Sequence, residues 1–264
     1  MVTEMPRSAS PTFTSMSSIG MSPDFDDLTR VLTSVGGDHT FARVHLRART
    51  ASALALALAV SCASVPDRPP REPGKFRAAD LVELTAIEPG IHTDVRYATA
   101  RNFVGRPVYS QARVFLQRPA AEAVARAHRA LAAQGYGLLV FDGYRPWSVT
   151  RLFWQVTPPH LHGFVADPRK GSRHNRGCAV DLTLFDLATG AEVEMPSPYD
   201  DFTDKAAQDY AGATPEQAAR RAILRNAMLH EGFLLYPSEW WHYDYADWQE
   251  YPILDVPFEQ LAGH

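Results

Sequence analysis

The sequence has little cysteine and no marked excess of charge. Only two cysteines, Cys62 and Cys178, occur in 264 residues. A framework of several disulfides, as in small secreted domains, is therefore excluded. The 26 basic and 30 acidic residues leave a formal net charge of −4. Because binding to nucleic acid or to an anionic membrane usually requires a basic surplus, we expect no nucleic-acid partner.

The sequence also lacks an apolar run long enough to cross a bilayer. The longest candidate, residues 51–61, follows three arginines between residues 43 and 49 and ends in AVSC at Cys62. A basic stretch, a short apolar stretch and small residues are typical of a secretory signal. The ending resembles a bacterial lipoprotein signal, in which Cys62 becomes lipidated. We therefore expect export to the periplasm, either after a plain signal peptide or as a lipoprotein anchored in the membrane through Cys62.

Composition divides the chain into three parts. Residues 1–62 form an N-terminal extension that ends in the export signal or lipoprotein-like signal, and residues 63–75, ASVPDRPPREPGK, read as a proline-rich linker. Residues 76–264 are of the usual length for one folded domain. Nothing in the sequence implies a protein partner.

Within residues 76–264, helix-like and strand-like patterns alternate irregularly. Alternating or apolar runs predict strands at 91–98, 136–142, 180–186 and near 233–245. Helices are predicted after Pro146, over an alanine-rich stretch at 118–135, and at 214–232, where a capping box precedes the helix. The mixture predicts an α+β fold, with a single compact domain and an antiparallel or mixed sheet flanked by helices.

His174 and Asp181, in the stretch SRHNRGCAVDLTLF, are the first candidates for a metal site. They can bind one ion only if the chain turns between them, and Asn175, Arg176 and Gly177 are suitable turn residues. The spacing permits a shared site without demanding one. A hydrogen-bonded structural pair is the alternative.

The segment SEWWHYDY adds Glu239 and His242. A catalytic zinc ion takes three protein ligands and leaves a position open for water, and a nearby carboxylate then accepts a proton. His174, Asp181 and His242 supply two imidazoles and one carboxylate, and Glu239 supplies the base. The alternative is that the tryptophans fill the core and the Glu–His pair is incidental.

Arg145, in FDGYRPW, comes just after a predicted strand, where site residues are often found. Its guanidinium is suited to pair with a substrate carboxylate or to stabilise an oxyanion. The alternative is an ordinary surface arginine paired with Asp142.

Four stretches together resemble the D-alanyl-D-alanine dipeptidase family. They run in the family's order from Arg96 to Tyr243: RYATARNFVGRPVY, FDGYRPW, SRHNRGCAVDLTL and SEWWHY. The resemblance implies the α+β fold of the zinc D-Ala-D-Ala metallopeptidases and one zinc ion per chain. It makes His174, Asp181 and His242 the zinc ligands. It also makes Glu239 the general base and Arg145 the group that stabilises the oxyanion.

The resemblance further implies three substrate-binding residues, Tyr97, Ser172 and Asp200. The stretch around Asp200 departs from the family pattern, with Pro196 in place of glycine and Tyr199 in place of phenylalanine. Cys178 lies inside the metal-binding motif. We interpret it as a small buried residue and not as a rival ligand.

The function implied is a zinc dipeptidase that hydrolyses D-Ala-D-Ala to two D-alanines. One alternative is a D,D-carboxypeptidase acting on longer peptidoglycan stem peptides, which shares the catalytic groups. Another is a non-catalytic zinc-binding cell-wall module. Glu239 argues against the module, because a purely structural zinc site has no need of a base.

Overall fold

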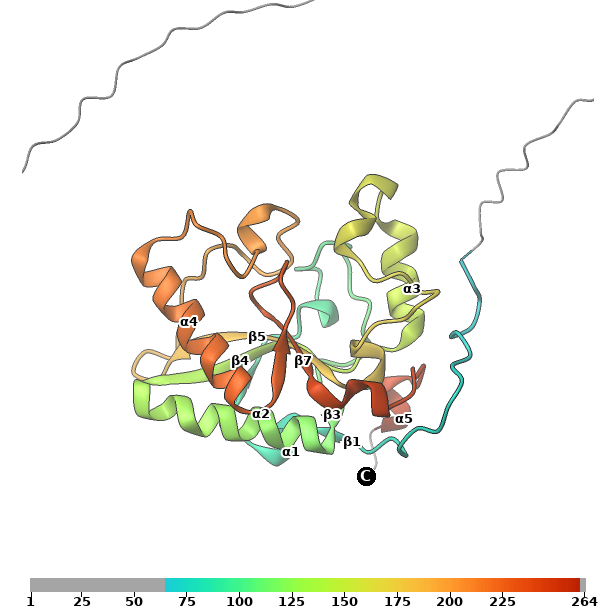
Figure 1. Cartoon of the computed structure of the whole chain (residues 1–264), viewed down its shortest axis with the longest axis horizontal. Coiled ribbons are helices and arrows are strands. Elements are labelled where there is room, and N and C mark those ends of the chain that lie inside the picture. The colour runs from blue at the N-terminus through green and yellow to red at the C-terminus, as the bar shows by residue number, and fades with distance from the viewer. Residues whose placement is uncertain (1–64, 262–264) are drawn as a thin grey trace, which may run out of the picture. The chain divides into compact units, whose positions relative to one another are not determined.

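The computed structural model describes residues 65–261 (Figure 1). The predicted signal and Cys62 lie outside these residues. The central feature is a five-stranded sheet in the order β2-β4-β5-β7-β6, in which β2 is parallel to β4 and all other pairs are antiparallel. Its strands are β2 (His92–Thr93), β4 (Tyr136–Asp142), β5 (Ala179–Asp186), β6 (Phe233–Leu235) and β7 (His242–Tyr245). A second, two-stranded sheet pairs β1 (Leu81–Glu83) with β3 (Phe115–Gln117).

Helices lie around the main sheet. They are α1 (Leu84–Ile87), α2 (Arg118–Leu131), α3 (Trp147–Val156), α4 (Pro215–His230) and α5 (Phe258–Leu261). Helices α2 and α4 contact each other, α2 packs on β4, and α4 packs on β6. Figure 1 shows α3 beyond the opposite end of the sheet from α4. The predicted α+β fold with a mixed sheet and flanking helices is confirmed. None of the helices in the described part is both long and apolar enough to span a membrane.

The two longest helices begin and end where local sequence signals placed them. In α4 the Thr214 side chain accepts from the backbone of Gln217, whose side chain accepts in return from the backbone of Thr214, so the predicted capping box is present. After α2 the chain makes one further 3₁₀ turn and stops at Gly135, in a left-handed conformation with φ of 81°.

The strand predicted over residues 91–98 was wrong in extent. Only His92–Thr93 is a strand, and Arg96–Ala98 is a 3₁₀ turn. The chain leaves β4 after the Asp94 amide donates to the Val140 carbonyl, and without further ladder bonds the alternating pattern cannot hold a strand. The turn buries Tyr97 and brings it to the site described below.

The predicted linker falls partly within the described residues, which form neither helix nor strand from residue 65 to residue 80. This segment is nevertheless attached to the domain. The Glu72 carboxylate accepts from the Arg176 guanidinium and, at 3.1 Å, from the Ile253 amide. The chain from residue 72 onward therefore follows a defined path over the domain.

Candidate metal centre and active site

Three polar side chains form one row across the middle of the main sheet. Asp142 of β4 is opposite Asp181 of β5, and Asp181 is opposite His242 of β7. Directly opposed residues on antiparallel strands hold their Cβ atoms about 5 Å apart, so these side chains meet. The β4–β5 register shifts between Val140 and Asp142, and this bulge brings the two aspartates into the row.

His174 reaches the row from a 3₁₀ turn, His174–Arg176, that precedes β5. The turn closes at Gly177, which adopts φ of +67°, and a Cβ there would lie 2.4 Å from Leu81. The positive φ favours glycine at this position, and any other residue would also require the Leu81 side chain to move. The chain therefore turns between His174 and Asp181, as a shared site requires, and both residues face one point.

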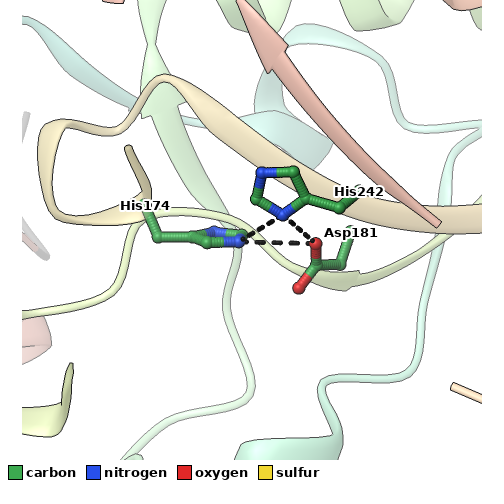
Figure 2. Close-up of side chains that lie close together, drawn as sticks. All are labelled: His174, Asp181 and His242. Atoms are coloured by element: carbon green, nitrogen blue, oxygen red, sulfur yellow. Dashed lines mark hydrogen bonds and ion pairs between the residues drawn. The ribbon is translucent and has the colours of Figure 1, made fainter. Parts of the chain in front are cut away.

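His174, Asp181 and His242 offer three atoms suited to one divalent metal ion (Figure 2). His174 Nε2 lies 3.2 Å from His242 Nδ1 and 3.4 Å from Asp181 Oδ1, and the last two atoms are 2.9 Å apart. Tetrahedral zinc with bonds of about 2.0–2.1 Å separates its ligand atoms by about 3.3 Å. All three residues are buried. The group fits a small metal ion.

Neighbouring groups determine which atom of each ligand faces the ion. The Gly143 carbonyl accepts from His174 Nδ1 at 2.7 Å, which leaves Nε2 with its lone pair for the metal. Tyr199 donates to Asp181 Oδ2 at 2.9 Å, which leaves Oδ1 as the ligand atom. On the far side of His242, Nε2 donates to Asp244 Oδ1 at 2.9 Å, so Nδ1 is the atom that would bind a metal ion.

The ionisation of this group suits a cation. Burial alone would raise the pKa of Asp181. The nearby imidazoles of His174 and His242, and their hydrogen bonds to the carboxylate, instead hold this pKa well below its ordinary value. Burial also works against a charged His242, yet Asp181 and Asp244 outweigh it and raise the pKa of that imidazole to about 10. Without metal, His242 carries a proton between two carboxylates. An ion that binds Nδ1 displaces this proton.

Asp244 was not among the predicted site residues, although it lies two positions after His242 and so on the same face of β7. Carboxylates that orient a metal-binding histidine typically contribute 10–100-fold in metal affinity. We expect Asp244→Asn to weaken zinc binding by about this factor, measured by competition with a chromophoric chelator. Asp247→Asn, a change at an exposed aspartate paired with Arg77, should leave zinc affinity unaltered. Equal affinities in the two variants would contradict this role.

Glu239 lies in the turn before β7, with its Oε2 atom 3.7 Å from His242 Nδ1. It lines the same cavity as the three ligand residues without being one of the metal-binding group. Burial raises the pKa of Glu239 to about 7. A carboxyl group with such a pKa both accepts and returns a proton near neutral pH.

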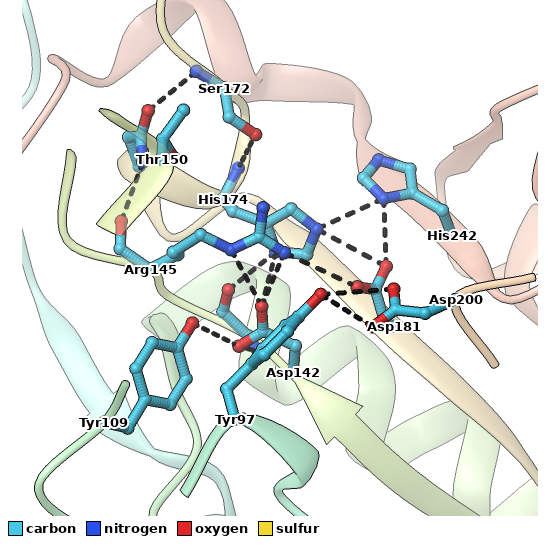
Figure 3. Close-up of polar contacts among 12 residues, drawn as sticks. Tyr97, Tyr109, Asp142, Arg145, Thr150, Ser172, His174, Asp181, Asp200 and His242 are labelled. Carbon is cyan, nitrogen blue, oxygen red and sulfur yellow. Dashed lines mark hydrogen bonds and ion pairs between the residues drawn. The ribbon is translucent and has the colours of Figure 1, made fainter. Parts of the chain in front are cut away.

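Arg145 follows β4 and is buried beside the row of polar residues (Figure 3). Its Nε and Nη2 both donate to Asp142 Oδ2, at 3.0 and 2.7 Å. Asp142 is held in turn by the Tyr109 hydroxyl, which donates to Oδ1 at 2.8 Å. Arg145 does pair with Asp142, as the alternative interpretation held, but the pair is buried and does not lie on the surface. Nη1 has no hydrogen bond within residues 65–261.

The three predicted substrate-binding residues line the same cavity as the metal ligands. Tyr97 donates to both oxygens of Asp200, at 2.9 and 3.1 Å. Asp200 has φ of 60°, a strained value for a residue other than glycine. Burial and the nearby Asp181 raise the pKa of Asp200 to about 8. Ser172 accepts from the His174 amide at 3.2 Å.

Cys178 is buried and does not belong to the metal-binding group found among the described residues. Burial raises the pKa of its thiol to about 12, so it stays a neutral thiol at physiological pH. This agrees with its interpretation as a small buried residue.

Comparisons with known proteins agree with this geometry. A sequence model of the D-ala-D-ala dipeptidase family matches residues 77–260, more than half of the chain. The D-alanyl-D-alanine dipeptidase of Escherichia coli K12 is 35% identical over 180 residues, which cover 68% of this chain and 91% of the relative. The enzyme of that name from Enterococcus faecium is 36% identical over 190 residues, or 64% and 92% of the two chains.

A third relative, from Streptomyces coelicolor, is 34% identical over 185 residues, covering 62% of this chain and 90% of the relative, and is also named D-alanyl-D-alanine dipeptidase. The matched residues include the metal-binding group His174, Asp181 and His242, as well as Glu239 and Arg145. The resemblance seen in the four sequence motifs is therefore confirmed, and this chain belongs to the D-Ala-D-Ala dipeptidase family of M15 peptidases.

Proposed function

We propose that this protein is a zinc-dependent dipeptidase that hydrolyses free D-Ala-D-Ala to two D-alanines, with one zinc ion per chain. The observation that carries the proposal is the convergence, in one cavity, of the buried group His174, Asp181 and His242 with Glu239 and Arg145. The family and the names of the curated relatives support the same substrate.

The donor set favours zinc. Two imidazole nitrogens and one carboxylate oxygen are a usual set of protein ligands at catalytic zinc, with a further position left open. Among divalent ions, calcium and magnesium prefer sites made only of oxygen ligands. When bound, zinc acts as a Lewis acid and makes water a stronger acid.

Glu239 and Arg145 supply the remaining chemistry. Glu239, beside the metal position, accepts a proton from the attacking water and returns it to the nitrogen of the leaving D-alanine. Arg145 is held rigidly by Asp142, and its Nη1 is available to donate to the scissile carbonyl oxygen as negative charge develops there. Because the guanidinium is already oriented, little reorganisation is needed during the reaction.

Asp200 and Tyr97 form the end of the cavity that suits the substrate's free ammonium group. Without a cation nearby, the Asp200 carboxyl has a pKa of about 8, since burial and Asp181 disfavour its charge. An ammonium group placed against it would supply the missing counter-charge. The Tyr97 hydroxyl holds the carboxylate in a single orientation.

The small size of the cavity supports a dipeptidase over the alternative D,D-carboxypeptidase. It measures about 120 Å³, well below the roughly 300–1,000 Å³ of pockets that take drug-sized ligands. Its walls include four phenylalanines: Phe103, Phe153, Phe164 and Phe202. In free D-Ala-D-Ala the amino group is a charged ammonium that can pair with Asp200. In a stem peptide the same nitrogen is acylated, so it carries no charge and the chain would have to continue past Asp200.

Relative rates on two substrates test this proposal. We expect chelator-sensitive release of D-alanine from D-Ala-D-Ala at least about a hundredfold faster than from a stem pentapeptide ending in D-Ala-D-Ala. Comparable rates on both would identify a carboxypeptidase. Zinc binding without hydrolysis of either would favour the non-catalytic module.

We also propose that the protein is exported, as a periplasmic protein or as a lipoprotein anchored through Cys62, and that it consumes dipeptide released by cell-wall turnover. The arginines and apolar run of residues 43–62 support this proposal. Cell fractionation tests it, and recovery of the full-length chain from the cytoplasm would contradict it.

A further inference from the structure

The cavity contains two arginines with different electrostatic surroundings. The Arg145 guanidinium is buried and donates twice to Asp142, and its Nη2 atom is also 3.8 Å from Asp181 Oδ2. Two carboxylates therefore offset one positive charge. Arg145 can donate a hydrogen bond, but it offers little net charge to a carboxylate of the substrate.

Arg173 is the second arginine, placed between Ser172 and the metal ligand His174. Its side chain is 40% exposed, and its Nε atom lies 3.6 Å from Asp244 Oδ2, beyond ordinary hydrogen-bond distance. Its Cζ atom is 4.8 Å from the centre of the Trp248 ring, a cation–π contact. Within residues 65–261 the guanidinium makes no hydrogen bond, so its donors are oriented but available.

Arg173 and Asp200 lie on different sides of the metal-binding group. Arg173 is next to Asp244, which contacts His242 on the face turned away from the metal. Asp200 is instead held by Tyr97, near Asp181. Figure 3 shows Ser172, the neighbour of Arg173, on one side of His174 and Asp200 on the other. The cavity therefore has a cationic part and an anionic part, with the metal position between them.

We infer that Arg173 binds the terminal carboxylate of the substrate. This inference rests on the proposed dipeptidase function. A guanidinium binds a carboxylate through paired hydrogen bonds, and the contacts with Trp248 and Asp244 orient Arg173 before the substrate arrives. The Ser172 hydroxyl accepts from the His174 amide and keeps its own proton to donate to the same carboxylate. A zwitterionic dipeptide then spans the cavity, with its ammonium group at Asp200.

A substrate without the negative charge tests the inference. The unmodified protein should prefer D-Ala-D-Ala to its C-terminal amide, D-alanyl-D-alaninamide. We expect Arg173→Gln to raise KM for the acid about 10- to 100-fold with a small change in kcat, and to leave KM for the amide nearly unaltered. The preference for the acid should thus largely disappear. Arg173→Lys keeps the charge and should restore part of it.

Two controls make the outcome specific. Lys170→Gln removes an exposed positive charge close to Arg173 in sequence, from a residue that does not line the cavity. This variant should keep the full preference for the acid. Zinc affinity, measured by chelator competition, should be equal in Arg173→Gln and the unmodified protein. An Arg173→Gln variant that keeps the acid preference overturns the inference and leaves the dipeptidase intact. Lost zinc binding in both Arg173 variants would also overturn it, because Arg173 would then act through the metal ligands.

Discussion

Glu239→Gln is expected to lower kcat for D-Ala-D-Ala by about 10²–10⁴-fold, the usual contribution of general acid–base catalysis, and to leave zinc affinity nearly unchanged. Glutamine has the same shape as glutamate but cannot accept the proton. Glu239 Oε2 lies 3.7 Å from His242 Nδ1, close enough to take a proton from water beside the metal ligands, and Glu239 is not one of the metal-binding group. The loss should therefore appear in turnover and not in metal content.

The measurement is steady-state D-alanine release by zinc-loaded protein, with zinc content determined in parallel. Glu250→Gln is the matched control, since it makes the same chemical change at an exposed glutamate near Arg77. This control should behave as the unmodified protein. Turnover of Glu239→Gln within about tenfold of the unmodified protein would show that another group accepts the proton.

Asp142→Asn should have the largest effect on stability, about 3–5 kcal/mol in the free energy of unfolding. Asp142 is 1% exposed and Arg145 is 8% exposed, so water cannot replace the lost carboxylate. Asparagine can still accept from Tyr109 and Gly143 through its carbonyl oxygen. Its amide group would then face the Arg145 donors, and only Asp181, 3.8 Å from Nη2, would remain to offset the buried charge. We also expect kcat to fall, because Arg145 loses its fixed position.

Urea unfolding with a common slope measures this effect. Asp80→Asn is the matched control, because Asp80 pairs with Arg118 in the same way but both side chains are about half exposed. Exposed ion pairs are screened by water and salt, so we expect no measurable change there. Equal stability of the Asp142 and Asp80 variants would contradict the proposed role of the buried pair.

Features that depend on a few neighbouring residues were predicted well. The capping box before α4 and the end of α2 near Gly135 follow from backbone hydrogen bonding within one or two turns. The strand over residues 91–98 was wrong because a strand depends on its partner, and β4 pairs with only two residues there. Short alternating patterns do not reveal the length of the ladder.

The sequence by itself determined the family, the α+β class and the three metal-binding candidates. Four motifs that occur in the family's order identify the family even though they are far apart in the chain. The roles assigned to Glu239, Arg145 and the substrate-binding residues stay predictions until the variants are measured. The structure adds that their side chains share one cavity with His174, Asp181 and His242.

Only the tertiary structure decided how the site is supported and charged. The row forms because a bulge in β4 and the pairing of β4, β5 and β7 place Asp142, Asp181 and His242 opposite one another. Asp244 becomes the partner of His242 because the Nε2 side of that imidazole points toward it. The sequence alone does not distinguish the charges of Arg145 and Arg173. In the structure two carboxylates offset the charge of buried Arg145, whereas Arg173 is partly exposed and lies near a single carboxylate, Asp244. Burial and counter-charges arise from residues far apart in the chain, and they determine what a charged side chain can do.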